Sequence, residues 1–110
     1  MELISNKARV IYAALDMLEA HSREQSVTAY TILDFLSEHE EVENHPILQH
    51  VSEIEFVDII MEITIKGVST ILTSLSKKGY VNKGEPENVV VDGETRFLRK
   101  YFLQKQFTND

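Results

Sequence analysis

The feature that most constrains this chain is the run of residues 64–83, which contains no Asp or Glu although the whole chain carries 18 of them. Apolar residues recur in it at the spacing that lines one face of an α-helix: Val68, Ile71, Leu72 and Leu75. Thr64 can cap the first turn, and Gly79 is the glycine expected just past a helix end. Tyr80 then begins an extended segment. The run predicts an amphipathic helix that leads directly into a strand.

The face opposite this apolar stripe carries only hydroxyl groups and cations. At about 100° per residue, it consists of Lys66, Ser69, Thr70, Thr73, Ser74 and Lys77. Such side chains contact DNA phosphates and base edges, whereas carboxylates are repelled by the phosphate backbone. One interpretation is a helix that enters the DNA major groove. The other is an ordinary amphipathic helix whose exposed face lacks acids, because amphipathicity alone indicates only a buried face.

Charge is divided unevenly along the chain, whose formal net charge is −7. Residues 1–63 carry three Lys or Arg against 13 Asp or Glu, and residues 64–110 carry eight against five. The first part therefore stands at −10 and the second at +3. A net negative charge argues against nucleic-acid binding. The asymmetry nevertheless indicates a basic part that can face a polyanion while the acidic part faces solvent or another protein.

Three further helices are predicted before this run, over residues 5–20, 28–38 and 52–62. Each has an apolar stripe, and Ser5, Thr28 and Ser52 are their predicted N-caps. Ser52 and Glu55 form a capping-box pattern. The helix over residues 52–62 has more apolar residues than one narrow stripe needs. It is either covered on two sides within the domain or has a spare face for a dimer contact.

Residues 39–50, H-E-E-V-E-N-H-P-I-L-Q-H, are predicted to be the least regular segment. Pro46 disfavours a helical conformation at the residue before it. The segment holds three histidines and three glutamates, which raises the question of a metal site. Their spacing matches no metal-binding motif, because zinc sites usually show closer paired ligands. We therefore expect a solvated acidic loop, with no metal and no cofactor.

The residues after the central helix are predicted to form a small antiparallel hairpin. Asp92-Gly93 is a strong turn pair between two apolar segments, and Ser26-Val27 is a candidate for a further, very short strand. Residues 98–103 are expected to return beside residues 80–83. Phe97, Tyr101 and Leu103 are expected in the core. Arg96 and Arg99 are candidate phosphate contacts.

The succession of helices, central helix and basic hairpin resembles the winged helix-turn-helix superfamily. Bacterial regulators of the MarR and PadR kind often show V-S-x-x-L-x-x-L-x-K-K-G-Y-V, then a variable wing and a K-Y-x-L strand. The matching residues are Val68, Ser69, Leu72, Leu75, Lys77, Lys78, Gly79, Tyr80, Val81, Lys100, Tyr101 and Leu103. The resemblance covers about residues 5–104. It implies a mainly α fold with a small β wing, about four helices followed by a two- or three-stranded antiparallel hairpin.

The resemblance implies a single winged-helix domain over residues 1–110, with a recognition helix at about 65–78 and a wing at about 80–103. The implied function is that of a DNA-binding transcriptional regulator of bacterial or phage type, with double-stranded DNA as partner. The residues expected to bind DNA are Lys66, Ser69, Thr70, Thr73, Lys77, Lys78, Lys83, Arg96 and Arg99. Such regulators commonly act as dimers, and a homodimer here is expected to use the first helix or residues 52–62.

The chain departs from these regulators in three respects. The predicted wing tips carry acids where a cation usually faces DNA: Glu85, Glu87, Asp92 and Glu94. The segment between the second and third helices is longer than usual, and the sequence shows no long helix after the wing. Because a fold does not imply a function, the alternative is a winged-helix protein–protein interaction module without DNA binding.

Other classes of protein lack support in the sequence. There is no cysteine, no phosphate-cradling glycine loop and no recognisable catalytic triad, so we do not expect an enzyme. No apolar run approaches the length of a membrane span, and the first residues do not resemble a signal peptide. A cytoplasmic protein without membrane contact is therefore expected.

Overall fold

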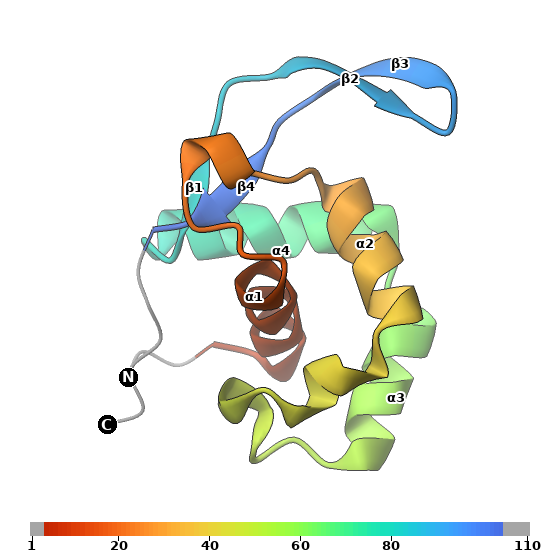
Figure 1. Ribbon diagram of the computed structural model, residues 1–110. Coiled ribbons are helices and arrows are strands. Elements are labelled where there is room, and N and C mark those ends of the chain that lie inside the picture. The colour runs from red at the N-terminus through yellow and green to blue at the C-terminus, as the bar shows by residue number, and fades with distance from the viewer. Residues whose placement is uncertain (1–3, 105–110) are drawn as a thin grey trace.

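The computed structural model describes residues 4–104, which form an α+β domain of four α-helices followed by short antiparallel strands (Figure 1). The helices are α1 (Asn6–Met17), α2 (Ala29–Glu38), α3 (Glu53–Glu62) and α4 (Ile65–Lys77). The strands are β1 (Val81–Lys83), β2 (Glu87–Val91), β3 (Glu94–Leu98) and β4 (Tyr101–Leu103). Three short 3-10 helices lie between them, η1 (Arg23–Gln25), η2 (Glu40–Asn44) and η3 (Pro46–Leu48). The predicted fold class is confirmed at this level.

Each α-helix begins after a hydroxyl residue whose oxygen accepts a hydrogen bond from the backbone N–H three residues later. The four caps are Ser5, Thr28, Ser52 and Thr64, with oxygen–nitrogen distances of 3.1, 3.2, 3.1 and 3.1 Å. These bonds satisfy N–H groups that have no partner inside the helix. All four predicted N-caps are confirmed. The carboxylate of Glu55 accepts a hydrogen bond from Asn6 of α1, which links α3 to the start of the first helix.

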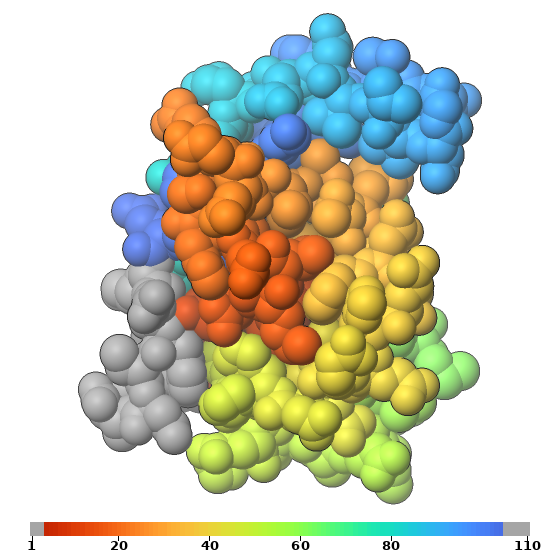
Figure 2. All heavy atoms as spheres, in the orientation of Figure 1, coloured from red at the N-terminus to blue at the C-terminus, as the bar shows by residue number. Residues whose placement is uncertain are grey.

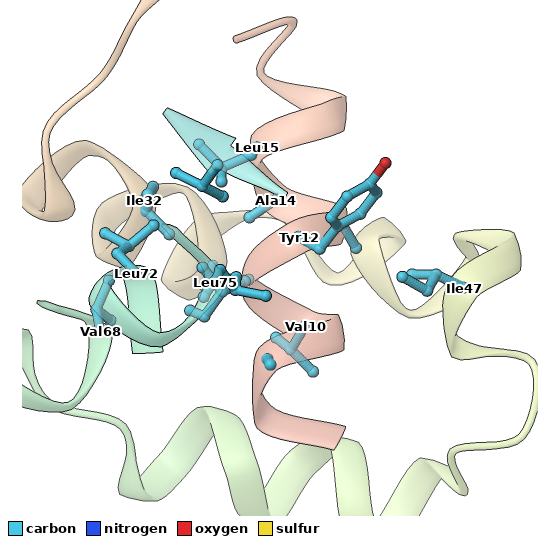
Figure 3. Close-up of a cluster of buried hydrophobic side chains, with 14 of the residues drawn as sticks. Val10, Tyr12, Ala14, Leu15, Ile32, Ile47, Val68, Leu72 and Leu75 are labelled. Carbon is cyan, nitrogen blue, oxygen red and sulfur yellow. The ribbon is translucent and has the colours of Figure 1, made fainter. Parts of the chain in front are cut away.

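Helix α1 lies at the centre of the molecule and packs against α2 and α4 (Figure 1). Most of its residues are buried, and Val10, Ile11 and Leu15 are fully inaccessible to solvent. Figure 3 shows side chains from α1 meeting Ile32 of α2 and the buried stripe of α4. The core therefore fixes the inner face of α4 and turns its other face outward. The same enclosure leaves α1 little apolar surface for a dimer contact.

The prediction of a solvated loop over residues 39–50 is wrong. This segment forms η2 and η3, and Val42, Ile47 and Leu48 are at most 3% exposed. The two short helices pack against α1, which gives their apolar side chains a surface to cover. Glu40 and Glu41 stay at the surface with Asn44, Pro46, Gln49 and His50, and Glu43 is half-buried. The segment is therefore a part of the core that carries an acidic outer side.

His45 ties this segment to α1 through the carboxylate of Asp16. The His45 Nδ1 atom accepts a hydrogen bond from the Ile47 N–H at 3.1 Å, so Nε2 is the donor to Asp16 Oδ2, at 2.7 Å. His21 Nε2 lies 2.7 Å from the other carboxylate oxygen of Asp16. Burial raises the pKa of Asp16, but the hydrogen bonds from His45 and His21 outweigh it and hold the pKa below its ordinary value of 3.8. Asp16 is thus stabilised as a carboxylate in the folded chain.

Replacing Asp16 with asparagine is expected to remove part of the acid sensitivity of the fold. Because the pKa of Asp16 is lowered in the folded chain, its carboxylate stabilises the fold at pH values above the ordinary value of 3.8. That stabilisation is lost as the pH falls through the lower pKa of the folded chain. The difference in free energy of unfolding between wild type and Asp16→Asn should therefore shrink as pH falls from about 5 to about 2. Urea denaturation at each pH measures it, with the exposed Asp34→Asn as control. A difference that is constant over this range contradicts the expectation.

The strands form two separate two-stranded ribbons. β1 pairs antiparallel with β4, with Val81 opposite Leu103, and Val27 forms a bridge to Tyr101 on the other side of β4. β2 pairs with β3 around Asp92 and Gly93, whose φ angles of 51° and 81° are those of a two-residue hairpin turn. The predicted hairpin and the return beside residues 80–83 are confirmed. Of the predicted strand at Ser26-Val27, the structure shows only an isolated bridge at Val27.

Phe97 is an exception to the predicted core. It is 70% exposed, whereas Tyr101 and Leu103 are only 6% exposed, as predicted. Residues 99 and 100 interrupt the strand between β3 and β4, so the alternation of inward and outward side chains does not continue across them. In the β2–β3 hairpin Phe97 lies opposite Asn88 and faces away from the helices together with Val90, which is also 70% exposed.

Replacing Gly79 with alanine is expected to lower the free energy of unfolding by about 1–2 kcal/mol. Gly79 has a φ of 84° between α4 and β1, and a Cβ atom added there meets no atom within 4 Å. The cost is therefore backbone conformation alone and not a clash. Gly79→Asn should recover part of it, because asparagine tolerates the left-handed region. Equal destabilisation by Ala and Asn, measured by thermal denaturation, contradicts this explanation.

Candidate nucleic-acid interface

Helix α4 has one buried and one exposed face, as its sequence predicts. Val68, Leu72 and Leu75 are at most 1% exposed. On the opposite face Lys66, Thr70, Ser74 and Lys77 are exposed, and Ser69 and Thr73 are half-buried. We call this second surface the α4 face. It consists of hydroxyls and cations, with no carboxylate contributed by residues 64–83.

The threonine hydroxyls of the α4 face donate hydrogen bonds to their own helix. Thr70 Oγ1 donates to the Lys66 carbonyl at 3.0 Å, and Thr73 Oγ1 donates to the Ser69 carbonyl at 3.1 Å. In this rotamer they offer lone pairs outward and have no hydrogen left for a phosphate oxygen. In this rotamer the two threonines donate nothing to an anion, so the lysine ammonium groups are the charged donors of this face.

Lys83 adds a cation from β1 to the edge of the α4 face. Its Nζ atom donates a hydrogen bond to Thr73 Oγ1 at 3.4 Å. The structure thus brings Lys83 beside the helix, although ten residues separate it from Thr73 in the chain. Lys78 is exposed at the C-terminal cap of α4, next to Lys77. Seven of the predicted DNA contacts consequently belong to α4, its cap and β1.

The two predicted arginine contacts lie in the hairpin and already have partners. Arg96 forms an ion pair with Glu94 at 3.1 Å, and its guanidinium lies 5.5 Å from the ring centre of Tyr30 in α2. Arg99 donates to the Gly84 carbonyl at 3.0 Å. Asp92 and Glu94 stand exposed at the hairpin turn. Arg96 therefore holds the hairpin against α2, and the hairpin turn presents acids outward.

Arg23 is a cation that sequence reasoning missed. A hollow of about 320 Å³ lies between η1, β1 and the base of the hairpin, and Arg23, Lys83 and Lys100 line it together with Glu85 and Glu87. In Figure 2 the segment around η1 (orange) lies next to the base of the hairpin (cyan). Lys100 is paired with Glu87 at 3.1 Å. The hollow thus places Arg23 on the same lining as Lys83, in a surface of mixed charge. No local signal predicts this position, because Arg23 lies in a polar connector 60 residues before Lys83.

Within residues 4–104, no three His, Cys, Asp or Glu side chains gather in a way that could hold a metal ion. Over the same residues, no helix has the length and apolar character needed to cross a membrane.

Comparison of the chain with models of protein families, with curated proteins and with solved structures finds no match.

Proposed function

We propose that this chain is a DNA-binding transcriptional regulator of the winged helix-turn-helix type, with α4 as the recognition helix in the major groove. The observation that carries the proposal is the α4 face, where Lys66 and Lys77 are exposed and Lys83 lies at the edge. Residues 64–83 contribute no carboxylate to this face. The order α1, Val27, α2, α4, β1, hairpin and β4 supports it, because a winged-helix domain has this succession. Helix α3 is then an additional helix before the recognition helix.

The spacing of the lysines suits the two backbones that border a groove. Lys66 and Lys77 lie eleven residues apart on α4, about 16 Å along the helix axis. The major groove of B-DNA is about 12 Å wide, so the two ammonium groups can reach phosphates on opposite sides. Ser69, Thr70 and Thr73 lie between them and would face base edges, the two threonines once their hydroxyls turn away from the helix. Lys78 and Lys83 flank this contact.

The hairpin contributes less than the wing of a typical regulator in this proposal. Arg96 and Arg99 would have to leave Glu94 and the Gly84 carbonyl before they contact phosphate. The exposed acids of the hairpin turn oppose an approach to the minor groove. Binding should therefore depend on the α4 face and on Lys83, and it should be sensitive to salt.

Fluorescence anisotropy with a labelled random-sequence duplex at two salt concentrations tests the proposal. Each phosphate contact contributes a slope of about −0.9 to log K against log salt. Contacts by Lys66, Lys77 and Lys83 predict a slope of about −3. Absence of binding at low salt contradicts the proposal, as does binding that does not respond to salt.

A second candidate function is a winged-helix protein–protein interaction module that does not bind DNA. Two observations favour it: the acidic hairpin turn and the large apolar side chains left exposed outside the core. Ile54 and Met61 of α3 are 77% and 79% exposed, and Val90 and Phe97 of the hairpin are each 70% exposed. Absence of DNA binding in the anisotropy experiment, together with saturable binding of a protein segment, would favour this module over the regulator.

A further inference from the structure

Helix α3 exposes a second apolar face besides the one it buries. Phe56 and Ile59 are buried in the core. Ile54, Val57 and Met61 are 77%, 44% and 79% exposed, and they recur at i, i+3 and i+7. We call these three residues the α3 stripe. That spacing lines one side of a helix in the way that a helix–helix contact requires.

A groove runs beside the α3 stripe, between α3, the end of α2 and η2. Its volume is about 250 Å³, and its apolar lining is Leu36, Phe56, Val57, Ile60 and Met61. Glu40, Glu43 and Glu53 line the same groove. Pockets that enclose drug-sized ligands are larger, roughly 300–1,000 Å³. The groove therefore suits the insertion of a side chain from a partner.

The acids around the groove form no ion pair with Lys or Arg within the described residues 4–104. Residues 24–65 contain ten Asp or Glu and no Lys or Arg. Within residues 4–104 Glu40, Glu43 and Glu53 form no ion pair, and Asp58 and Glu62 lie along the other edge of the stripe. An apolar seam between two acidic edges is complementary to an apolar seam between basic edges.

We propose that the α3 stripe and its groove bind an amphipathic segment of a partner protein, with apolar side chains on one face and Lys or Arg beside them. The mode is a helix laid in a groove, with an apolar side chain inserted beside Met61. A second copy of this chain fits the surface less well. A two-fold contact through α3 would place the acidic edges of one copy, with Glu53, Asp58 and Glu62, against the same acidic edges of the other. Like charges across an interface are unfavourable.

The proposed binding does not depend on the DNA-binding proposal, because the two use different surfaces. The α4 face consists of cations and hydroxyls from residues 66–77, whereas the α3 stripe and its groove use residues 36–61. Variants of the α4 face should lose DNA binding and keep peptide binding, and variants of the α3 stripe or its groove should do the reverse. The two proposals can therefore fail independently.

A fluorescein-labelled 14-residue peptide of leucine and lysine, with its leucines on one helical face, is the probe. Its matched control has glutamate in place of every lysine. Anisotropy titration should show saturable binding of the lysine peptide and weaker binding of the glutamate peptide by at least about tenfold. Failure to bind the lysine peptide, or equal binding of both peptides, overturns the proposal.

Two variants place the binding on the groove. The triple change Glu40→Gln, Glu43→Gln and Glu53→Gln should weaken the lysine peptide by about tenfold, and so should Ile54→Ser with Met61→Ser. The control triple Glu19→Gln, Glu24→Gln and Glu85→Gln changes the net charge equally at exposed positions outside the groove. It should bind like wild type. Equal weakening by both triples overturns the proposal, and so does a dimer in sedimentation that Met61→Ser dissociates, because a second copy is then the occupant.

Discussion

Neutralising Lys66 and Lys77 together, as Lys66→Gln and Lys77→Gln, is expected to weaken binding to duplex DNA by roughly 60-fold at 0.1 M salt. Each phosphate contact contributes about 0.9 to the slope of log K against log salt, which is about eightfold at 0.1 M relative to 1 M. Both lysines are exposed on the α4 face. The loss of two contacts should also reduce the salt slope by about two. Anisotropy titration at several salt concentrations measures both quantities.

The matched control for this variant is Lys7→Glu. It lowers the net charge by two, as the double glutamine variant does, and Lys7 is exposed in the first turn of α1. Lys7→Glu should bind DNA nearly as wild type does. If it weakens binding as much as the double variant, overall charge governs the interaction and the α4 face has no special role. Circular dichroism of all three proteins shows whether each remains folded.

Replacing Leu72 with alanine is expected to lower the free energy of unfolding by about 2–5 kcal/mol. Leu72 is 0% exposed on the inner face of α4, the helix that packs on both α1 and α2 (Figure 3). Truncation removes buried apolar contacts and leaves a cavity where α1, α2 and α4 pack together. In a domain of about this size each kcal/mol corresponds to roughly 4–8 °C in melting temperature. Thermal and urea denaturation should therefore show a large shift.

Ile54→Ala is the control for this variant, because it truncates a side chain of similar size that lies outside the core. Ile54 is 77% exposed on α3, so its truncation should change the free energy of unfolding by no more than about 0.5 kcal/mol. The pair separates a packing effect from the loss of an apolar residue as such. A Leu72→Ala protein as stable as Ile54→Ala contradicts the description of α4 as the helix around which the core closes.

The features that could be predicted from the sequence are those that local chemistry decides. Ser5, Thr28, Ser52 and Thr64 cap their helices because a hydroxyl oxygen meets an N–H three residues away in the chain. Asp92-Gly93 forms its turn because both residues tolerate positive φ angles. The two faces of α4 follow from a period that is visible in thirteen residues.

The features that could not be predicted depend on contacts between distant segments. Val42, Ile47 and Leu48 are buried because α1 offers them a surface, and nothing within residues 39–50 indicates it. Phe97 faces outward because the strand breaks before Tyr101, which places the two aromatics in different ribbons.

The candidate site divides in the same way. Lys66, Thr70 and Lys77 share the α4 face because helical geometry places them there. Lys83 reaches Thr73, and Arg23 joins the hollow near Lys83, only because the chain returns on itself. The pairing of Arg96 with Glu94 and its contact with Tyr30 also become visible only in the folded chain.

An NMR titration of the ¹⁵N-labelled chain with a random-sequence duplex tests the central claim most directly, because it reports where DNA contacts the surface. The proposal predicts that the largest amide shift changes occur within residues 64–83, at Lys66, Thr70, Lys77 and Lys83 above all. Amides of α3 should change little, since that helix presents an acidic and apolar surface. Shift changes confined to α3 or the hairpin turn, or the absence of any change at low salt, would contradict a recognition role for α4.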